Sequence, residues 1–254
     1  MAEATPINLL QLTDLHLPEQ PGTLRRDADA EARFLQALAA IQSLSADLLL
    51  LTGDLTHHAP SAYTRLAEAV APLPYPACWI PGNHDLPDAM AGFPALSRKQ
   101  IDFDHWRIIL LDSTSEPNGI GGGSLAATEL LFLEQQLASA GSKHCLVALH
   151  HNPIPVQSVW QDRISLGNPE AFWQIIDGSS QVRGVVFGHL HQRRDENRGP
   201  VKLFCSPATA PQYKAGTEAP EDEPDPVLAA PAYSHYRLWP EGHIEVSVTH
   251  LFNE

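Results

Sequence analysis

Short apolar runs alternate with amphipathic stretches along much of the chain, and this alternation restricts the fold more than any other feature. Residues 7–12 and 46–51 are apolar runs of strand length, and residues 27–44 between them carry apolar side chains near helical spacing. A strand, a helix and a second strand in this order are typical of a sheet of parallel strands that is covered by helices. The sequence therefore predicts the α/β class.

The same rhythm predicts further elements as far as residue 187. Helices are expected at 61–70, 128–138 and 169–176, and strands at 78–80, 101–104, 106–113, 145–150 and 182–187. After these, shorter and more alternating runs at 201–206, 234–239 and 244–252 predict antiparallel strands that close a second sheet. A chain of 254 residues is long enough for one well-buried core, so residues 1–254 are expected to form a single domain.

Two segments have a composition that cannot supply a core. Residues 215–232 are rich in proline and acidic side chains, which predicts a mobile surface loop, with a flap over a nearby pocket as the alternative. Residues 119–124, GIGGGS, lack the lysine and the spacing of a P-loop. A flexible turn is therefore favoured for them over a phosphate cradle.

The formal net charge of −14 argues against broad binding of nucleic acid or anionic lipid, because both would be repelled. No stretch is long enough to cross a bilayer, and MAEATPINLL has no signal-peptide pattern, so a cytoplasmic protein is expected. Cys78, Cys145 and Cys205 lie in apolar surroundings and are expected to be buried thiols. An anionic substrate would need a local positive centre.

Five of the apolar runs end in side chains that can bind a metal ion. These are Asp14 and His16 in TDLH, Asp54 in TGD, Asn83 and His84 in PGNHD, the pair His150 and His151, and His189 and His191 in GHLH. The carboxyl ends of parallel strands lie along one edge of a sheet, and α/β proteins bind ligands at that edge. We therefore expect these side chains to converge at a single edge of one sheet.

Spacing and residue type support a common metal site. Asp14 and His16 are two residues apart, as are His189 and His191, and in an extended segment such a pair projects to the same side. Two carboxylates, one amide and several imidazoles suit manganese, iron, cobalt or zinc better than calcium. One aspartate or histidine after a strand is more often a turn residue, but five such strand ends indicate a metal site.

The ordered motifs DLH, GD, GNHD, HH and GHLH resemble those of the calcineurin-like metallophosphoesterases, and QLTDLHL is similar to the bacterial class III cyclic nucleotide phosphodiesterases among them. The resemblance extends from about Asn8 to the region APAYSHYRLWPEG. It implies a four-layer α-β-β-α sandwich, in which helices flank two mixed β-sheets. One departure is HHNP, where Asn152 replaces the usual first proline.

The resemblance also implies two metal ions and the residues that hold them. One ion would be bound by Asp14, His16, Asp54 and His191, and the other by Asp54, Asn83, His150 and His189. Asp54 would bridge the two ions. The first histidine of the His-His pair normally binds metal in this family, so His150 is the expected ligand and His151 the alternative.

His84 and Asp85 are the catalytic candidates. His84 resembles the family histidine that stabilises the phosphoryl group and protonates the leaving oxygen. Asp85 would either orient His84 or serve as a turn or capping residue. Five further side chains are candidates for pocket walls, although core or surface positions are favoured for each of them: His57, His58, Tyr63, Trp160 and Tyr213.

The predicted reaction is hydrolysis of a phosphodiester by a metal-bridging hydroxide, since two divalent ions lower the pKa of a shared water and clamp the phosphoryl oxygens. The expected substrate is a 3′,5′-cyclic nucleotide, which is opened to the nucleoside 5′-monophosphate. The alternatives are another small phosphodiester, such as a glycerophosphodiester or 2′,3′-cyclic nucleotide, a phosphomonoester, and a non-catalytic binding module of the same fold. No stable nucleic-acid or membrane partner is expected, and the C-terminal strands or the acidic loop could form a homodimer interface.

Overall fold

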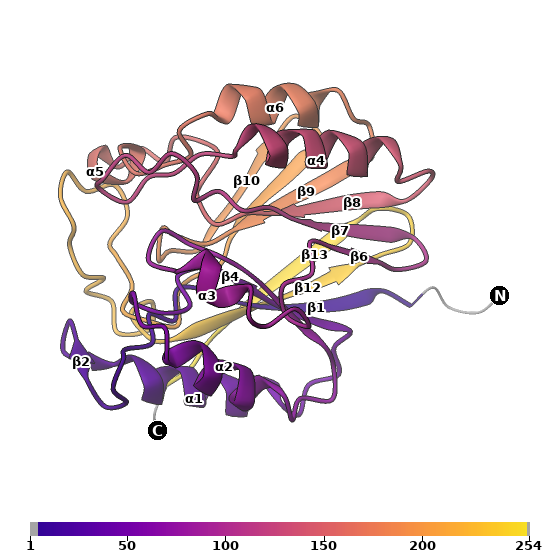
Figure 1. Ribbon diagram of the computed structural model, residues 1–254. Helices are drawn as coiled ribbons and strands as arrows, with labels where there is room; N and C mark the ends of the chain where they lie inside the picture. Colours follow the sequence, from indigo (N-terminus) through magenta and orange to yellow (C-terminus); the bar gives the residue numbers. More distant parts are fainter. Residues whose placement is uncertain (1–4, 253–254) are drawn as a thin grey trace.

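The computed structural model describes residues 5–252 and contains two large β-sheets that pack face to face, with helices on both outer faces (Figure 1). The helices are α1 (Ala30–Ile41), α2 (Ala62–Val70), α3 (Pro87–Met90), α4 (Ala127–Ala138), α5 (Val159–Asp162) and α6 (Pro169–Asp177). The strands are β1 (Ile7–Leu12), β2 (Leu24–Arg25), β3 (Ala28–Asp29), β4 (Leu48–Thr52), β5 (Ala77–Ile80), β6 (Gln100–Asp102), β7 (Trp106–Leu110), β8 (His144–Ala148), β9 (Val182–Phe187), β10 (Arg194–Arg198), β11 (Val201–Cys205), β12 (Ala232–Leu238) and β13 (Ile244–His250). The predicted four-layer α-β-β-α sandwich is confirmed.

The first sheet has the strand order β13-β12-β1-β4-β5. Strands β1, β4 and β5 are parallel, and β12 and β13 extend the sheet by antiparallel pairing. Helices α1 and α2 cover its outer face at the bottom of Figure 1, where Phe34 and Leu66 pack with Leu10 and Leu49 in one cluster. This half of the molecule is therefore a βαβαβ unit with two added strands.

The second sheet has the strand order β10-β11-β9-β8-β7-β6. Its four central strands are parallel, and β6 and β10 pair antiparallel at the two edges. Helices α4 and α6 cover its outer face at the top of Figure 1, where Leu133 and Phe172 pack with Val147 and Val185.

Strand β4 shows why its sequence run does not alternate. Leu49 and Leu51 face the helices of the first half, whereas Leu48 and Leu50 lie in the cluster between the sheets with residues such as Ile108 of the second sheet. A strand that is buried on both faces needs apolar side chains at every position. Burial of the central strands thus sets the two sheets face to face.

The C-terminal strands differ from the prediction. Strand β11 joins the second sheet by parallel pairing with β9, whereas β12 and β13 join the first sheet beside β1. The prediction of antiparallel pairing is confirmed for β12 and β13, whereas the prediction that all three runs close one second sheet is wrong. An alternating run identifies a strand but does not specify its partner, because the partner depends on which sheet edge is open.

A short hairpin precedes α1, and the prediction missed it. The helix expected at 27–44 begins only at Ala30, because the Asp29 side chain caps it by accepting a hydrogen bond from the Ala32 amide at 3.0 Å. Strands β2 and β3 form the hairpin, with Arg26 and Asp27 at its turn in left-handed conformation (φ 49° and 59°). Two central residues with positive φ are typical of a tight two-residue hairpin turn.

The acidic segment, residues 206–231, connects β11 to β12 and contains one isolated bridge, between Tyr213 and Asp222. It descends along the left side of Figure 1, from near α5 to the level of β2. Arg26 of the hairpin forms an ion pair with Asp222, and the Trp160 indole N–H donates to Thr217 Oγ1 at 3.1 Å. The segment is therefore attached to both halves of the molecule and is not a free loop.

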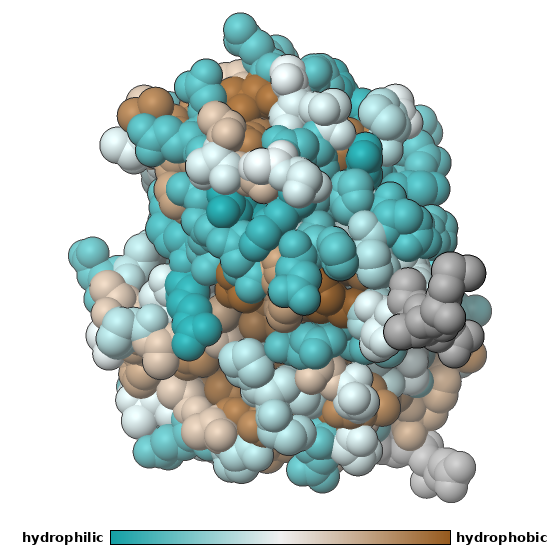
Figure 2. All heavy atoms as spheres, turned by 90° about the vertical axis from the view of Figure 1, so that its right-hand side faces the viewer, coloured by the Kyte–Doolittle hydropathy of each residue, from teal (hydrophilic) through white to brown (hydrophobic). Residues whose placement is uncertain are grey.

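Figure 2 shows the face of the molecule that forms the right-hand side of Figure 1, away from the acidic segment. Hydrophilic residues cover most of this face, and apolar residues gather between its upper and lower halves.

None of the helices within residues 5–252 is long and apolar enough to cross a bilayer. Cys78, Cys145 and Cys205 are buried free thiols, as the sequence predicts.

Asp102 and Arg107 form a two-point ion pair between β6 and β7. Arg107 Nε lies 2.9 Å from Asp102 Oδ1, and Nη2 lies 3.1 Å from Oδ2. Arg107 Nη1 also donates to the Gln136 carbonyl and to Ser139 Oγ, both at 2.9 Å, so it links α4 to the sheet. Hydrogen bonds from Arg107 and Lys143 lower the pKa of Asp102 to about 2.

We predict that Asp102→Asn lowers the free energy of unfolding at pH 7 by about 1 kcal/mol, since Asp102 is partly exposed and solvent screens the pair. Because the folded-state pKa lies below the ordinary value of 3.8, the contribution of the charge is present above pH 4 and disappears as the pH falls toward 2. Urea unfolding between pH 7 and pH 3 measures this difference. Asp104→Asn is the control, and a difference that does not change with pH would contradict the prediction.

Candidate metal centre

The seven predicted ligands lie at the carboxyl ends of parallel strands from both sheets. In the first sheet Asp14 and His16 follow β1, Asp54 follows β4 and Asn83 follows β5, and in the second sheet His150 follows β8 while His189 and His191 follow β9. The prediction of a single edge of one sheet is therefore wrong, because the residues converge where the edges of two sheets meet. The His189 amide donates to Asp14 Oδ2 at 3.0 Å and so joins the two edges directly.

The backbone at these positions is left-handed. Asp14, His16, Asp54, His189 and His191 have φ angles of 53°, 50°, 50°, 70° and 52°. Such angles cost a residue other than glycine about 1 kcal/mol or more, and residues that hold them gather at functional sites. The prediction that each pair at positions i and i+2 lies in an extended segment is therefore wrong. The chain turns at each of these residues, and the turns direct both side chains toward the clusters.

Glycines before the ligands allow the loops to approach closely. Gly53 precedes Asp54 with a φ of 90°, and a Cβ at this position would overlap the His150 ring. Gly188 precedes His189, and a Cβ there would overlap Thr13 Oγ1 and lie 2.7 Å from Asp14 Oδ2. Both sites need a residue without a side chain.

A first cluster brings together Asp14, His16 and His191, whose ligand atoms lie within 4.8 Å of one another. His16 Nε2 lies 3.1 Å from His191 Nε2, and His191 Nε2 lies 3.3 Å from Asp14 Oδ1. Asp54 borders this cluster, with its Oδ2 at 3.6 Å from His16 Nε2. One carboxylate and two imidazoles therefore face a common point.

A second cluster brings together Asp54, His150 and His189. His150 Nε2 lies 3.1 Å from His189 Nδ1 and 3.5 Å from Asp54 Oδ1, and Asn83 Oδ1 lies 3.2 Å from the same nitrogen. The two Asp54 oxygens therefore point to different clusters. This arrangement is the one required of a carboxylate that bridges two ions.

Backbone carbonyls orient three of the imidazoles. His150 Nδ1 contacts the Thr52 carbonyl at 2.9 Å, His191 Nδ1 contacts the Pro211 carbonyl at 2.7 Å, and His189 Nε2 contacts the Ile164 carbonyl at 2.8 Å. A carbonyl can only accept, so the ring nitrogen that faces it carries the proton in the neutral ring. The other ring nitrogen then presents its lone pair to the cluster, as in metal-binding histidines.

The donor set fits cations. Asp14 and Asp54 are 0% and 2% exposed, and Asp14 Oδ1 receives no hydrogen bond from the described residues. Burial raises the pKa of both carboxyls, but neighbouring imidazoles outweigh it and lower the pKa of Asp14 to about 2 and that of Asp54 well below its ordinary value. Two buried carboxylates with so few donors are stable only beside positive charge, which divalent ions in the two clusters would supply.

His151 occupies a different environment from His150. It is fully buried, with Nδ1 at 2.8 Å from Ser113 Oγ and Nε2 at 3.2 Å from the Gly121 carbonyl. Both ring nitrogens are thus engaged away from the clusters, whereas His150 directs Nε2 into one of them. The geometry favours His150 over His151 as a ligand.

His84 lies beside the clusters, but Asp85 does not orient it. The His84 amide donates to Asp54 Oδ1 at 2.8 Å, and its Nδ1 lies 3.2 Å from His58 Nε2. Asp85 instead accepts four hydrogen bonds of 2.8 to 3.0 Å, from the Leu55, Thr56 and Gly82 amides and the Tyr63 hydroxyl. Its oxygens are saturated, so the assignment of Asp85 as a group that orients His84 is corrected to a structural role at the turn.

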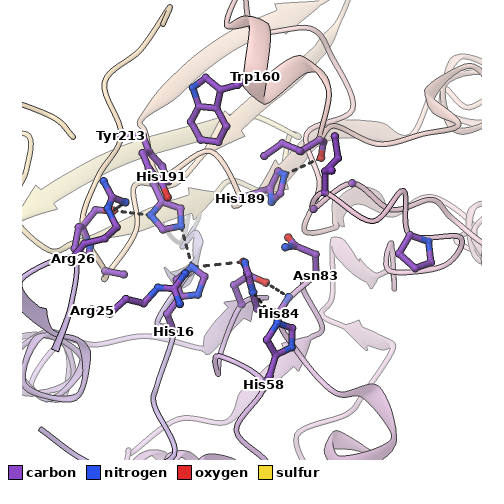
Figure 3. A pocket seen from close by; sticks show the side chains of 18 of the residues that line it. His16, Arg25, Arg26, His58, Asn83, His84, Trp160, His189, His191 and Tyr213 are labelled. Carbon is purple, nitrogen blue, oxygen red and sulfur yellow. Dashed lines mark hydrogen bonds and ion pairs between the residues drawn. The ribbon is translucent and has the colours of Figure 1, made fainter. Parts of the chain in front are cut away.

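A pocket of about 490 Å³ opens beside the clusters (Figure 3). Of the five wall candidates, His58, Trp160 and Tyr213 line it, whereas Tyr63 is buried in the first half of the core. His57 contacts the His84 ring at 4.5 Å between centroids and belongs with His16 and His84 to a third group that could hold an ion. The pocket also includes Arg25 and Arg26 of the hairpin, which no periodic pattern in the sequence identifies.

The fold agrees with the comparisons to known proteins. Residues 7–193 match the family described as calcineurin-like phosphoesterase, and the chain belongs to this family. A solved structure described as a dimetal phosphatase from Danio rerio shares the fold, with a TM-score of 0.68 over 97% of this chain and 100% of that chain at 12% identity.

Several curated bacterial proteins are similar over most of the chain. The 3′,5′-cyclic adenosine monophosphate phosphodiesterase CpdA of Pseudomonas aeruginosa is 34% identical, over 96% of this chain and 89% of its own length. CpdA of Vibrio vulnificus is 35% identical over 82% of this chain and 78% of its own. The 3′,5′-cyclic-nucleotide phosphodiesterase alr5338 of Nostoc is 34% identical over 85% and 83%.

We predict that His150→Gln lowers the metal content of the purified protein, whereas the neighbouring variant His151→Gln leaves it within error of the wild type. The first change removes a nitrogen that faces the second cluster. The second removes the hydrogen bonds to Ser113 and Gly121 and the ring contacts with His150 and His189, but no nitrogen that faces a cluster. Elemental analysis after gel filtration measures the ions per chain, and circular dichroism reports whether each variant is folded. Loss of metal only in the His151 variant would reverse the assignment.

Proposed function

We propose that this chain is a metal-dependent phosphodiesterase that opens a 3′,5′-cyclic nucleotide to the nucleoside 5′-monophosphate. The observation that supports this most is the arrangement of the two buried clusters. Asp54 belongs to one cluster and borders the other, and both open into a pocket. The pocket volume of about 490 Å³ is within the range of sites for small molecules. The relatives that are similar over most of the chain are named for this activity.

The proposed ligands of one ion are Asp14, His16, Asp54 and His191, and those of the other are Asp54, Asn83, His150 and His189. When bound, two divalent ions would supply an activated water at neutral pH and positive charge for the phosphoryl oxygens. Mixed nitrogen and oxygen donors suit manganese, iron, cobalt or zinc.

His84 is proposed to donate a hydrogen bond to the phosphoryl group and a proton to the leaving oxygen. When both nitrogens of the His84 ring carry a proton, Nδ1 donates to His58 Nε2 and Nε2 is left for the substrate. Transfer of the Nε2 proton to the leaving oxygen returns the neutral ring, and burial favours this release because it lowers the pKa of His84. His58 then acts on the substrate only through His84.

Arg25 is proposed to attract the anionic substrate. The chain carries a formal net charge of −14, but Arg25 lines the pocket and forms no ion pair within residues 5–252. Its charge contributes to the lowered pKa of His84, which places the guanidinium within electrostatic range of that ring. A cation in a cleft raises the local concentration of an anion even when the protein as a whole is acidic.

The alternatives make different demands on the same residues. A non-catalytic binding module is expected to have lost ligands, whereas all seven proposed ligands and His84 are present here. Another small phosphodiester or a phosphomonoester would use the same clusters and differ only in its contacts with the pocket wall.

A rate comparison tests the proposal. We expect the metal-loaded protein to have a higher kcat/KM for 3′,5′-cyclic AMP than for glycerophosphocholine or 4-nitrophenyl phosphate, because the ribose and base add contacts in the pocket. We expect the same preference over 2′,3′-cyclic AMP, because its phosphate bridges other ribose oxygens and the base then lies elsewhere when the phosphate is bound. Product analysis should give the 5′-monophosphate. A preference for 4-nitrophenyl phosphate would overturn the diesterase proposal.

We predict that His84→Ala lowers kcat by about 100-fold or more while the metal content stays near that of the wild type, because His84 is not among the proposed ligands. The loss should be largest for esters with poor leaving groups, which need the proton most. Initial rates with alkyl and 4-nitrophenyl esters of the same phosphate measure this dependence. Equal losses for both leaving groups would contradict a role in proton transfer.

A further inference from the structure

The pocket has an unlike lining. Arg25, His58 and His84 contribute cationic or imidazole groups, whereas Ile120, Ile164 and Trp160 contribute apolar surface. Figure 3 shows Trp160 at the top and His58 at the bottom of the pocket, with His189 and His191 between them. The Trp160 ring has no charge to offer a phosphate, so it is suited to another part of the substrate.

Trp160 is held in place by the acidic segment. Its indole N–H donates to Thr217 Oγ1 at 3.1 Å, and Ser158 Oγ, at the start of α5, donates to the Thr217 carbonyl at 3.0 Å. Thr217 is itself buried. The polar atom of the indole is therefore satisfied outside the pocket, and the apolar part of the ring points between Tyr213 and His189 in Figure 3.

The helix that carries Trp160 is also fastened to the candidate metal centre. The next residue, Gln161, is fully buried and donates to the carbonyl of Leu190, which lies between His189 and His191. Ile164, one turn further along, supplies the carbonyl that contacts His189. The position of the indole is thus fixed relative to the proposed ligands.

Tyr213 supports Trp160 but is less available itself. The two rings meet edge to face, with centroids 4.8 Å apart at 71°. The Arg26 guanidinium lies 3.9 Å from the Tyr213 ring centre, and the His191 ring lies 5.0 Å away. Tyr213 therefore has neighbours around its ring, and Trp160 is the aromatic surface left to a ligand.

We propose that Trp160 is the specificity-determining residue on which the nucleobase stacks, an inference that rests on the function proposed above. Every nucleobase has a flat π-face, so an indole recognises bases as a class without selecting strongly among them. Ile120 and Ile164 line the same pocket and would add apolar contacts around the stacked base. Trp160 thereby selects nucleotides over diesters that have no base.

The test compares Trp160→Ala with the wild type, both loaded with manganese, on 3′,5′-cyclic AMP and on 1,3-propanediol cyclic phosphate, which has the same cyclic diester without ribose or base. We expect the variant to lose about 5- to 100-fold in kcat/KM for cyclic AMP, mainly through KM, and less than about twofold for the base-free diester. Trp160→Phe should restore most of the loss. Equal losses on both substrates, or no loss on cyclic AMP, would overturn the proposal.

Val159→Ala is the matched control, since Val159 is on the same helix and is 52% exposed. Calorimetry with AMP and ribose 5-phosphate separates this proposal from the proposed function. If the wild type hydrolyses no diester but Trp160→Ala weakens binding of AMP and not of ribose 5-phosphate, the proposed function fails and the stacking site stands. If both ligands weaken equally, the stacking site fails.

Discussion

Two carboxylates buried between the ends of the two sheets are the constraint on which the rest of the site depends. Asp14 and Asp54 are 0% and 2% exposed, and a buried carboxylate is stable only with positive charge or several donors nearby. The surrounding imidazoles come from both sheets, so this requirement fixes how the sheet edges meet. Hydrogen bonds across the junction, such as Gln11 Nε2 to the Phe187 carbonyl at 3.1 Å, keep that alignment.

The local backbone follows from the same requirement. Five side chains of the two clusters can point to common centres only because the chain turns through left-handed angles at their own residues. The strain is tolerated because these turns are hydrogen-bonded to one another, as in the His16 amide to the Asp54 carbonyl at 2.8 Å. Asp85 has an equivalent role on one side, where its four bonds tie the turn after β4 to the turn after β5.

The sequence predicted what depends on residue type and order, and failed where the outcome depends on tertiary pairing. The leucines of β4 predicted a strand, and five strand ends predicted which side chains would gather. No local pattern in the sequence indicated which sheet β12 joins, or that both sheets contribute to the site, because long-range packing determines strand partners. Arg25 was missed for a similar reason, since its hairpin has two-residue strands without periodicity.

The pocket wall includes contacts with the acidic segment, which composition alone would assign to a free loop. Arg26 contacts the acidic segment through Asp222 and Tyr213, and Thr217 of that segment holds Trp160. The acidic residues that give the chain its negative charge therefore include one that neutralises Arg26, while Arg25 beside it is left without an ion pair in the described structure. Because Asp222 pairs with Arg26, Arg25 is the unpaired arginine among the described residues that line the pocket. Under the proposed function, selectivity among anions would depend less on charge than on Trp160, where a substrate with an aromatic group would gain contacts that a bare phosphate ester cannot make.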